Sequence, residues 1–523
     1  MTVTCNLEES LNELPRCVFD MMKYMDEATN NPIPADEAVP APSDALDCVP
    51  SEAANAPLTP VERGERMLDD FNKLLKARKN KEAWALDEEL SGRRMGTFRD
   101  TYEPKHPTIL VVHASVGSGH RSAAIGIAQA LERLRDSGKP AFPDGSPMDP
   151  ETKIAVIDVL SWGEHEFDGN KTASMFTGIT RPYYDITWRF TFTGRLLWGG
   201  GTFLNYILWR KYTRFIGHVK PLAVIATHIQ GANLSAGARA MCNLDFPIVS
   251  VPTDYETEGL WPHKETDVFC VGTESMAETL RARKIPESRI RITGIPTRQD
   301  FRNEHDRDAT RAELGIPQDC TLAVCLAGAH LPQPYVNMRK IVNDSLSAMA
   351  SHPNMHLVVV CGKDADYEAQ VRSIVARYQL TNVTVMGYTS DMAALMAASD
   401  LVLCKAGGLT VTECLCVGSP MVLIGRVYGQ EKINMLMLTS HGCATHVTTA
   451  RELIDTISTL DALPQRLETM AVSANLFKRV NAADDICKIA LELAQNTGEL
   501  DTPRMKHNWF FRLYIGDTPA HTR

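Results

Sequence analysis

The chain has 523 residues, of which 44% are hydrophobic, and its formal net charge is −10. The length allows about three domains of ~150 residues with ordinary cores, while the acidic balance excludes the overall basic surface of a typical nucleic-acid-binding protein. The thirteen cysteines are irregularly spaced and include no CxxC pair, which argues against a disulfide framework or a zinc ribbon. We therefore expect buried, reduced thiols in a cytoplasmic protein without a metal site.

Residues 1–100 are predicted to form an acidic, largely disordered extension. Residues 1–60 carry eleven acidic residues against two basic ones and are rich in proline and alanine, a composition that disfavours a packed core. Glu8, Glu9 and Glu13 stand where a secretory signal would have its apolar segment. No run of ~18 apolar residues predicts a membrane span.

Residues 101–298 alternate strand and helix signals. The apolar run Thr108–His113 precedes a glycine-rich loop and a helical pattern over 122–134, and further apolar runs cover 154–160, 223–227 and 248–251. Residues 299–475 repeat the pattern, with runs at 322–327, 356–361, 383–386 and 401–404. Short apolar runs between helices indicate parallel strands covered on both faces. We expect an α/β fold of two Rossmann-like doubly wound domains facing across a cleft, joined near 294–300, with 476–523 forming a C-terminal helix and tail that packs back on the first domain.

The first glycine loop, residues 113–121 (HASVGSGHR), follows a strand and opens a helix. A helix N-terminus presents unpaired N–H groups to an anion or a polar substrate. It also disfavours a charged imidazole, so His120 is a candidate general base; the alternative is a surface histidine near a helix cap. The loop is neither a Walker A motif nor a complete GxGxxG, which weakens the interpretation as an NAD-dependent oxidoreductase.

The second glycine loop lies at 405–413 (KAGGLTVTE), again between a strand and a helix. Its backbone could hold a diphosphate. Glu413 could accept hydrogen bonds from two ribose hydroxyls, or it could form a structural capping box with Thr410. Gln430 and Asn434 follow on one face of a predicted helix, where amides suit a hydroxyl-rich sugar.

These motifs, taken in order, resemble the family of monogalactosyldiacylglycerol synthases and processive diacylglycerol glucosyltransferases, which are GT-B glycosyltransferases. The resemblance covers residues 108–495 and rests on GxGHR (117–121), KAGGxTxxE (405–413) and GQExxN (429–434). It extends to VPTDY (251–255), TGIP (293–296) and MGY (386–388). It implies a UDP-sugar donor as co-substrate, inversion at the anomeric carbon, a lipid acceptor on the N-terminal domain, and no separate cofactor.

The resemblance also implies a set of site residues. The catalytic candidates are His120 and Asp254, and residues near the acceptor or phosphates are Ser115, Gly117, Gly119 and Arg121. Uracil is expected at Gly387 and Tyr388, the diphosphate at Gly407, Gly408, Leu409 and Thr410, the ribose at Glu413, and further donor contacts at Gly328, Lys405, Gln430, Glu431 and Asn434. One departure is the loop 326–334, where Pro332 and Pro334 remove backbone donors from a place that is glycine-rich in the family.

Residues 181–215 are predicted to face a membrane. They hold eleven aromatic residues and six Lys or Arg against one acidic residue, and their uncharged stretch 196–209 is too short to cross a bilayer. Aromatic rings interleaved with cations are typical of an anionic lipid interface; the alternative is a pair of aromatic helices in the core. The predicted membrane-facing residues are Trp188, Arg189, Arg195, Trp198, Trp209, Arg210 and Lys211.

The sequence thus favours an inverting hexosyltransferase that moves sugar from a UDP-sugar to a lipid such as diacylglycerol. It would act in the cytoplasm, peripherally attached to the inner face of the cell membrane. Two alternatives stay open, a UDP-sugar epimerase-like enzyme and a catalytically inactive protein that binds lipid or nucleotide.

Overall fold

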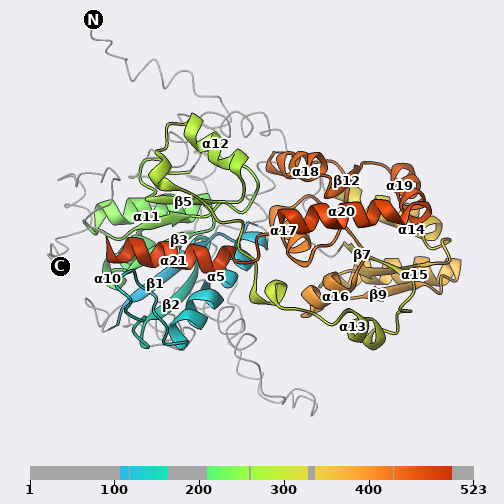
Figure 1. Ribbon diagram of the computed structural model, residues 1–523, viewed down its shortest axis with the longest axis horizontal. Coiled ribbons are helices and arrows are strands. Elements are labelled where there is room, and N and C mark those ends of the chain that lie inside the picture. Colours follow the sequence, from blue (N-terminus) through green and yellow to red (C-terminus); the bar gives the residue numbers. More distant parts are fainter. Residues whose placement is uncertain are drawn as a thin grey trace, which may run out of the picture. The chain divides into compact units, whose positions relative to one another are not determined.

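The computed structural model describes residues 106–116, 118–162, 209–257, 261–327, 336–427 and 429–496. These residues all belong to one compact unit of the chain. They form two six-stranded sheets, ordered β2-β1-β3-β4-β5-β6 and β12-β11-β10-β7-β8-β9 (Figure 1). Every strand pair in both sheets is parallel.

The first sheet consists of β1 (Thr108–His113), β2 (Lys153–Asp158), β3 (Ala223–Ala226), β4 (Ile248–Ser250), β5 (Val268–Val271) and β6 (Ile290–Ile292). Its helices are α5 (Gly119–Asp136), η2 (Val159–Trp162), α10 (Arg210–Val219), α11 (Ile229–Met241), α12 (Glu274–Ala282) and η4 (Glu287–Arg289).

The second sheet consists of β7 (Thr321–Leu326), β8 (Met355–Val360), β9 (Val383–Met386), β10 (Leu401–Cys404), β11 (Met421–Ile424) and β12 (Ala444–Val447). The remaining helices are η5 (Gln299–Arg302), α13 (Arg307–Glu313), α14 (Val336–Met349), α15 (Ala365–Tyr378), α16 (Met392–Ala398), α17 (Gly408–Val417), α18 (Gln430–Ser440), α19 (Ala450–Ala462), α20 (Pro464–Phe477) and α21 (Ala482–Gln495).

Both faces of the first sheet are covered, which explains why its central strands are continuously apolar. On β1, Leu110 and Val112 pack with residues of α10 and α11, whereas Ile109 and Val111 pack with α5 and α21. Helix α21 comes from the far end of the chain and lies alongside α5 (Figure 1). The second sheet is covered in the same alternating way, with α14, α15 and α19 against one face.

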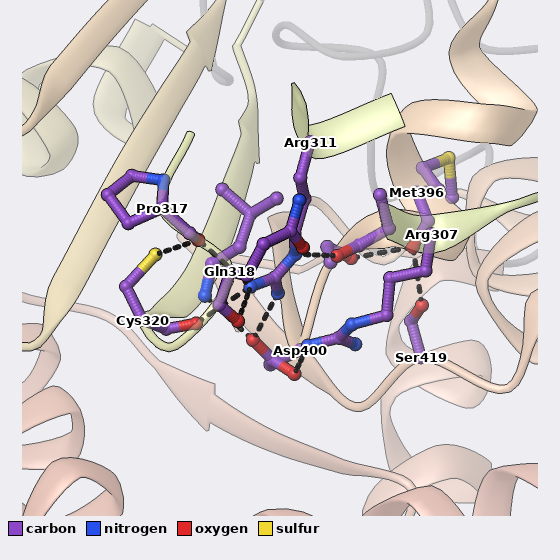
Figure 2. A network of polar contacts seen from close by, with 11 residues as sticks. Arg307, Arg311, Pro317, Gln318, Cys320, Met396, Asp400 and Ser419 are labelled. Atoms are coloured by element: carbon purple, nitrogen blue, oxygen red, sulfur yellow. Dashed lines mark hydrogen bonds and ion pairs between the residues drawn. The ribbon is translucent and has the colours of Figure 1, made fainter. Parts of the chain in front are cut away.

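A buried arginine ties α13 to the second sheet. Figure 2 shows Arg311, which is 0% exposed, at the centre of a polar network: it donates to Asp400 Oδ2 at 2.8 Å and to the Ala398 carbonyl at 3.0 Å. Asp400 also accepts from the backbone N–H of Leu322 at 2.7 Å and from Arg307 at 2.6 Å. Because a buried guanidinium needs both a counter-charge and acceptors, this network fixes how β7, β10 and α13 meet.

The expected fold class, two Rossmann-like doubly wound domains, is confirmed. Strands β1, β9 and β10 have the predicted bounds, and β2, β3, β4, β7 and β8 differ from prediction by one or two residues at their ends. Strands β5, β6, β11 and β12 were not predicted. The domain boundaries drawn from the sequence stay predictions.

Candidate functional site

Each sheet has a point where the strand order changes direction. It lies between β1 and β3 in the first sheet and between β7 and β10 in the second. In open α/β sheets, ligands bind beyond the carboxyl ends of the strands at such points. Both predicted glycine loops lie there: the first joins β1 to α5, and the second joins β10 to α17.

His120 lies in the first turn of α5, and its ring contacts the loops that follow β3 and β4. Its Nδ1 lies 3.0 Å from the Thr227 carbonyl and 2.8 Å from Thr253 Oγ1. A carbonyl oxygen can only accept, so Nδ1 carries the proton of the neutral ring and the lone pair lies on Nε2. This is the tautomer that a general base requires.

The surroundings of His120 favour its neutral form. Burial is the largest effect and lowers the pKa of His120 below its ordinary value of 6.5, against an opposing effect of the Asp254 carboxylate. The ring of His228 packs edge-on against it, with ring centroids 4.6 Å apart. Burial lowers the pKa of His228 well below 6.5, and the neighbouring His120 lowers it further. Because two protonated imidazoles this close would repel each other, both rings are neutral near pH 7.

The rest of the first loop is organised around Asp158, at the end of β2. The Asp158 carboxylate accepts from Ser115 Oγ at 2.5 Å and from the Ser115 N–H at 3.2 Å. Helix α5 begins after Ser118, which makes no side-chain hydrogen bond to the first turn. Arg121 lies in that turn, and Gly117 lies outside the described residues.

The second glycine turn packs directly on the loop that follows β4. A Cβ at Gly408 would lie 2.1 Å from the Thr253 carbonyl oxygen and 2.6 Å from Asp254 Oδ1. A Cβ at Gly119 would lie 3.5 Å from Cβ of Leu409. The starts of α5 and α17 are therefore neighbours, and glycine at 408 is required by the close approach of another backbone.

Glu413 is not part of a capping box. Helix α17 begins after Gly407 without a side-chain cap, and Thr410 is its third residue rather than its N-cap, so that alternative was wrong. Burial raises the pKa of Glu413 to about 7, opposed by Arg298 and reinforced by Asp300. Glu413 is the sixth residue of α17 and is partly exposed, so its carboxyl is available to a ligand and does not cap the helix.

The other predicted donor residues differ in how the protein uses them. The Lys405 ammonium pairs with Glu431 at 2.5 Å, and Gln430 opens α18. Asn434 is fully buried and directs both of its N–H groups to protein atoms, Asp254 Oδ1 at 2.8 Å and the Ala406 carbonyl at 2.9 Å. No N–H of Asn434 is therefore left for a sugar in this conformation.

Gly387 and Tyr388 follow β9. A Cβ at Gly387 would lie 2.9 Å from Glu368 Oε2, so the backbone there is closely packed. Tyr388 is 63% exposed, and the Lys363 ammonium lies 5.0 Å from its ring centroid. Gly328 and the proline-containing loop lie outside the described residues.

The predicted membrane segment is corrected at its described end. Trp209 is 4% exposed, and its indole N–H donates to the Val159 carbonyl at 2.8 Å. It is a core residue of this structure, as are Tyr212 and Phe215, because buried acceptors and apolar neighbours satisfy these rings as well as a lipid interface would. Lys211 is partly buried in α10. Trp188, Arg189, Arg195, Trp198 and the side chain of Arg210 lie outside the described residues.

Sequence reasoning missed several residues of the site. Thr227 and His228 follow β3 at the switch point, and Asp158 ends β2. Their position directly after apolar strands was the available signal. Within the described part of the chain, no helix has the length and apolar character needed to cross a membrane.

Comparisons with known proteins match the predicted resemblance. Residues 178–297 match the family model of monogalactosyldiacylglycerol (MGDG) synthase, and residues 333–486 match that of the glycosyltransferase family 28 C-terminal domain. A processive diacylglycerol beta-glucosyltransferase of Bacillus licheniformis is 24% identical over 391 residues, which cover 74% of this chain and 95% of that protein. One of Staphylococcus saprophyticus is 25% identical over 276 residues, 52% of this chain and 68% of that protein.

A solved structure shares the fold. The UDP-GlcNAc 2-epimerase from Neisseria meningitidis, solved with UDP-GlcNAc bound, is 15% identical and has a TM-score of 0.50, covering 73% of this chain and 99% of that one. At this identity the likeness concerns the fold alone.

Proposed function

We propose that this protein transfers a hexose from a UDP-sugar to the hydroxyl of a lipid such as diacylglycerol. Its matches to the monogalactosyldiacylglycerol synthase and processive diacylglycerol glucosyltransferase family support this reaction. The observation that carries this proposal is the environment of His120. Its Nε2 lone pair is unprotonated, and its partner Thr253 lies against the second glycine turn.

The reaction is a single displacement at the anomeric carbon. His120 Nε2 takes the proton from the acceptor hydroxyl while the oxygen of that hydroxyl forms a bond to the anomeric carbon. The bond from that carbon to the diphosphate oxygen breaks on the opposite face, so configuration inverts and UDP leaves. The charge of Asp254 acts on the imidazole and raises its pKa, so it stabilises the imidazolium that forms.

Donor binding is assigned to the start of α17. The backbone N–H groups of residues 408–410 have no side-chain cap, and a helix N-terminus favours the charge that grows on the leaving diphosphate. Glu413 is the candidate partner of the ribose hydroxyls. Because burial raises its pKa to about 7, accepting two hydroxyl hydrogen bonds would favour its ionised form and couple nucleotide binding to proton release.

The acceptor is assigned to the first sheet, on the side of His120. A lipid acceptor requires the protein to meet a membrane surface, and we propose peripheral attachment at the inner face of the cell membrane. The names of the relatives support a diacylglycerol acceptor and a glucosyl group.

The test is an incubation of the purified protein with UDP-glucose or UDP-galactose and vesicles containing diacylglycerol, followed by mass spectrometry of the lipids. The proposal predicts a lipid heavier by one hexose, formed together with UDP. An epimerised UDP-sugar or free hexose formed without lipid would favour an epimerase-like enzyme. UDP binding without turnover of any donor would favour an inactive binding protein.

A further inference from the structure

Asn434 joins the two halves of the site through one buried side chain. It lies on α18 and is 0% exposed. Its Oδ1 accepts from the Tyr255 N–H at 2.8 Å, and its Nδ2 donates to Asp254 Oδ1 at 2.8 Å and to the Ala406 carbonyl at 2.9 Å. A buried amide with all these contacts has one defined orientation.

The contacts of Asn434 connect the second glycine turn, which is the proposed donor turn, with the proposed base, His120. Ala406 belongs to the second glycine turn, one residue before the N-cap of α17. Asp254 follows Thr253, whose hydroxyl contacts Nδ1 of His120. The backbone of Gly408 also packs closely on Thr253, so the second glycine turn and the loop after β4 are in direct contact. A displacement of the donor turn therefore moves Asp254, and with it the adjacent Thr253, whose hydroxyl contacts the imidazole of His120.

We propose that Asn434 is a positioning residue that couples the donor turn to the Asp254–His120 pair, rather than a residue that binds the donor sugar. The inference rests on the proposed function and extends it. It means that the acceptor base reaches its working geometry when the donor turn is seated, so that the hydroxyl is activated with donor in place and wasteful hydrolysis is limited.

The titratable groups around His120 determine how the positioning role of Asn434 can be measured. They are Asp254 from the loop after β4, His228 at the start of α11 and His113 at the end of β1, while Arg121 acts on His113. In Asn434→Asp the shape of the side chain is kept, but the amide that donates to Asp254 Oδ1 at 2.8 Å is replaced by a fully buried carboxyl group. Two carboxyls this close share one proton, so the charge of Asp254 near His120 is partly neutralised. This lowers the pKa of His120 and moves the acid limb of the kcat profile to lower pH.

The experiment compares wild type, Asn434→Asp, Asn434→Ala and the control Tyr255→Phe. The control removes a second hydrogen bond between the halves, from Tyr255 Oη to Thr412 Oγ1 at 2.9 Å, without touching Asp254. The measurements are kcat against pH, UDP affinity by calorimetry, and the titration of His120 by NMR of labelled histidine. Circular dichroism verifies that each variant is folded.

The positioning role predicts that both Asn434 variants lose about 10- to 100-fold in kcat, while UDP affinity changes by less than about threefold, well below that loss. It also predicts that Asn434→Asp lowers the pKa of His120. Tyr255→Phe should keep the wild-type pH profile. Equal losses in Tyr255→Phe, or an Asn434→Asp variant with a raised donor KM and an unmoved His120 titration, would overturn the proposal.

The two proposals fail in different ways. If the wild type forms no glycolipid, the proposed function fails, and the NMR titration still decides whether Asn434 controls the environment of His120. If glycolipid forms but the titration of His120 is the same in wild type and Asn434→Asp, the positioning role fails alone.

Discussion

Gly408→Ala tests how closely the two halves of the site must meet. The new Cβ would lie 2.1 Å from the Thr253 carbonyl oxygen, where real Cβ contacts essentially never fall below 3.0 Å. The neighbour is backbone and cannot rotate away as a side chain could. The Thr253 segment must therefore retreat by roughly 1 Å, a displacement that can cost an enzyme about 100-fold in rate.

That displacement has two consequences of different size. Overpacking of this kind costs about 1–3 kcal/mol of folding free energy, which leaves most domains folded. It also separates Thr253 from His120 Nδ1, now 2.8 Å apart, so the base loses its orientation. We expect kcat to fall by about 100-fold while the thermal midpoint drops by a few degrees.

The assay is glycolipid formation at saturating donor together with thermal unfolding. Gly126→Ala is the matched control, because its Cβ would lie 2.3 Å from the Thr297 carbonyl oxygen, a comparable clash with backbone in the middle of α5. The control should lose stability to a similar degree and retain far more activity. Gly408→Ala with kcat within about threefold of wild type, far short of the expected loss, would refute the argument.

Three further predictions follow from charges in the described residues. Since burial raises the pKa of Glu413 to about 7, UDP binding at pH 7 should release a proton, seen by calorimetry in buffers of different ionisation enthalpy and lost in Glu413→Gln. Burial lowers the pKa of His113 from 6.5 to about 4, so the unfolded chain binds the extra proton between these values. The free energy of unfolding should fall as pH drops from 6.5 towards 4, by at most about 1.4 kcal/mol per pH unit for this group, and urea titrations should show a weaker dependence in His113→Phe. Asp400→Ala leaves Arg311, which is 0% exposed, without its counter-charge; urea unfolding should report a loss of about 3–5 kcal/mol, and an unchanged midpoint would contradict the importance of this network.

The fold was largely predictable because its central strands are buried on both faces. Runs such as Thr108–His113 and Leu401–Cys404 are continuous and apolar, and each precedes a glycine turn. The edge strand β6 has Arg291 at its centre and the edge strand β12 contains Thr445 and His446, so neither is a continuous apolar run. Strands β5 and β11 are fully buried four-residue apolar runs of the same kind as β10, so their signal was present in the sequence and was missed.

The site was predictable where it is local. A glycine turn and a helix start are adjacent in sequence, so His120 and the turn at Gly408 could be proposed from the residues alone. The partners of Asn434 could not, since Asp254 lies 180 positions earlier and no periodicity encodes that distance. Trp209 shows the reverse problem, because aromatic residues next to cations have the same pattern in a core and at a lipid interface.

The most direct measurement of the central claim is glycolipid formation by His120→Gln, a variant that keeps a polar side chain of similar length without a base. Removal of a general base should lower kcat by about 10²- to 10⁴-fold, with UDP affinity and thermal stability close to wild type. Full activity in a folded His120→Gln protein would contradict the assignment of His120 as the residue that activates the acceptor hydroxyl.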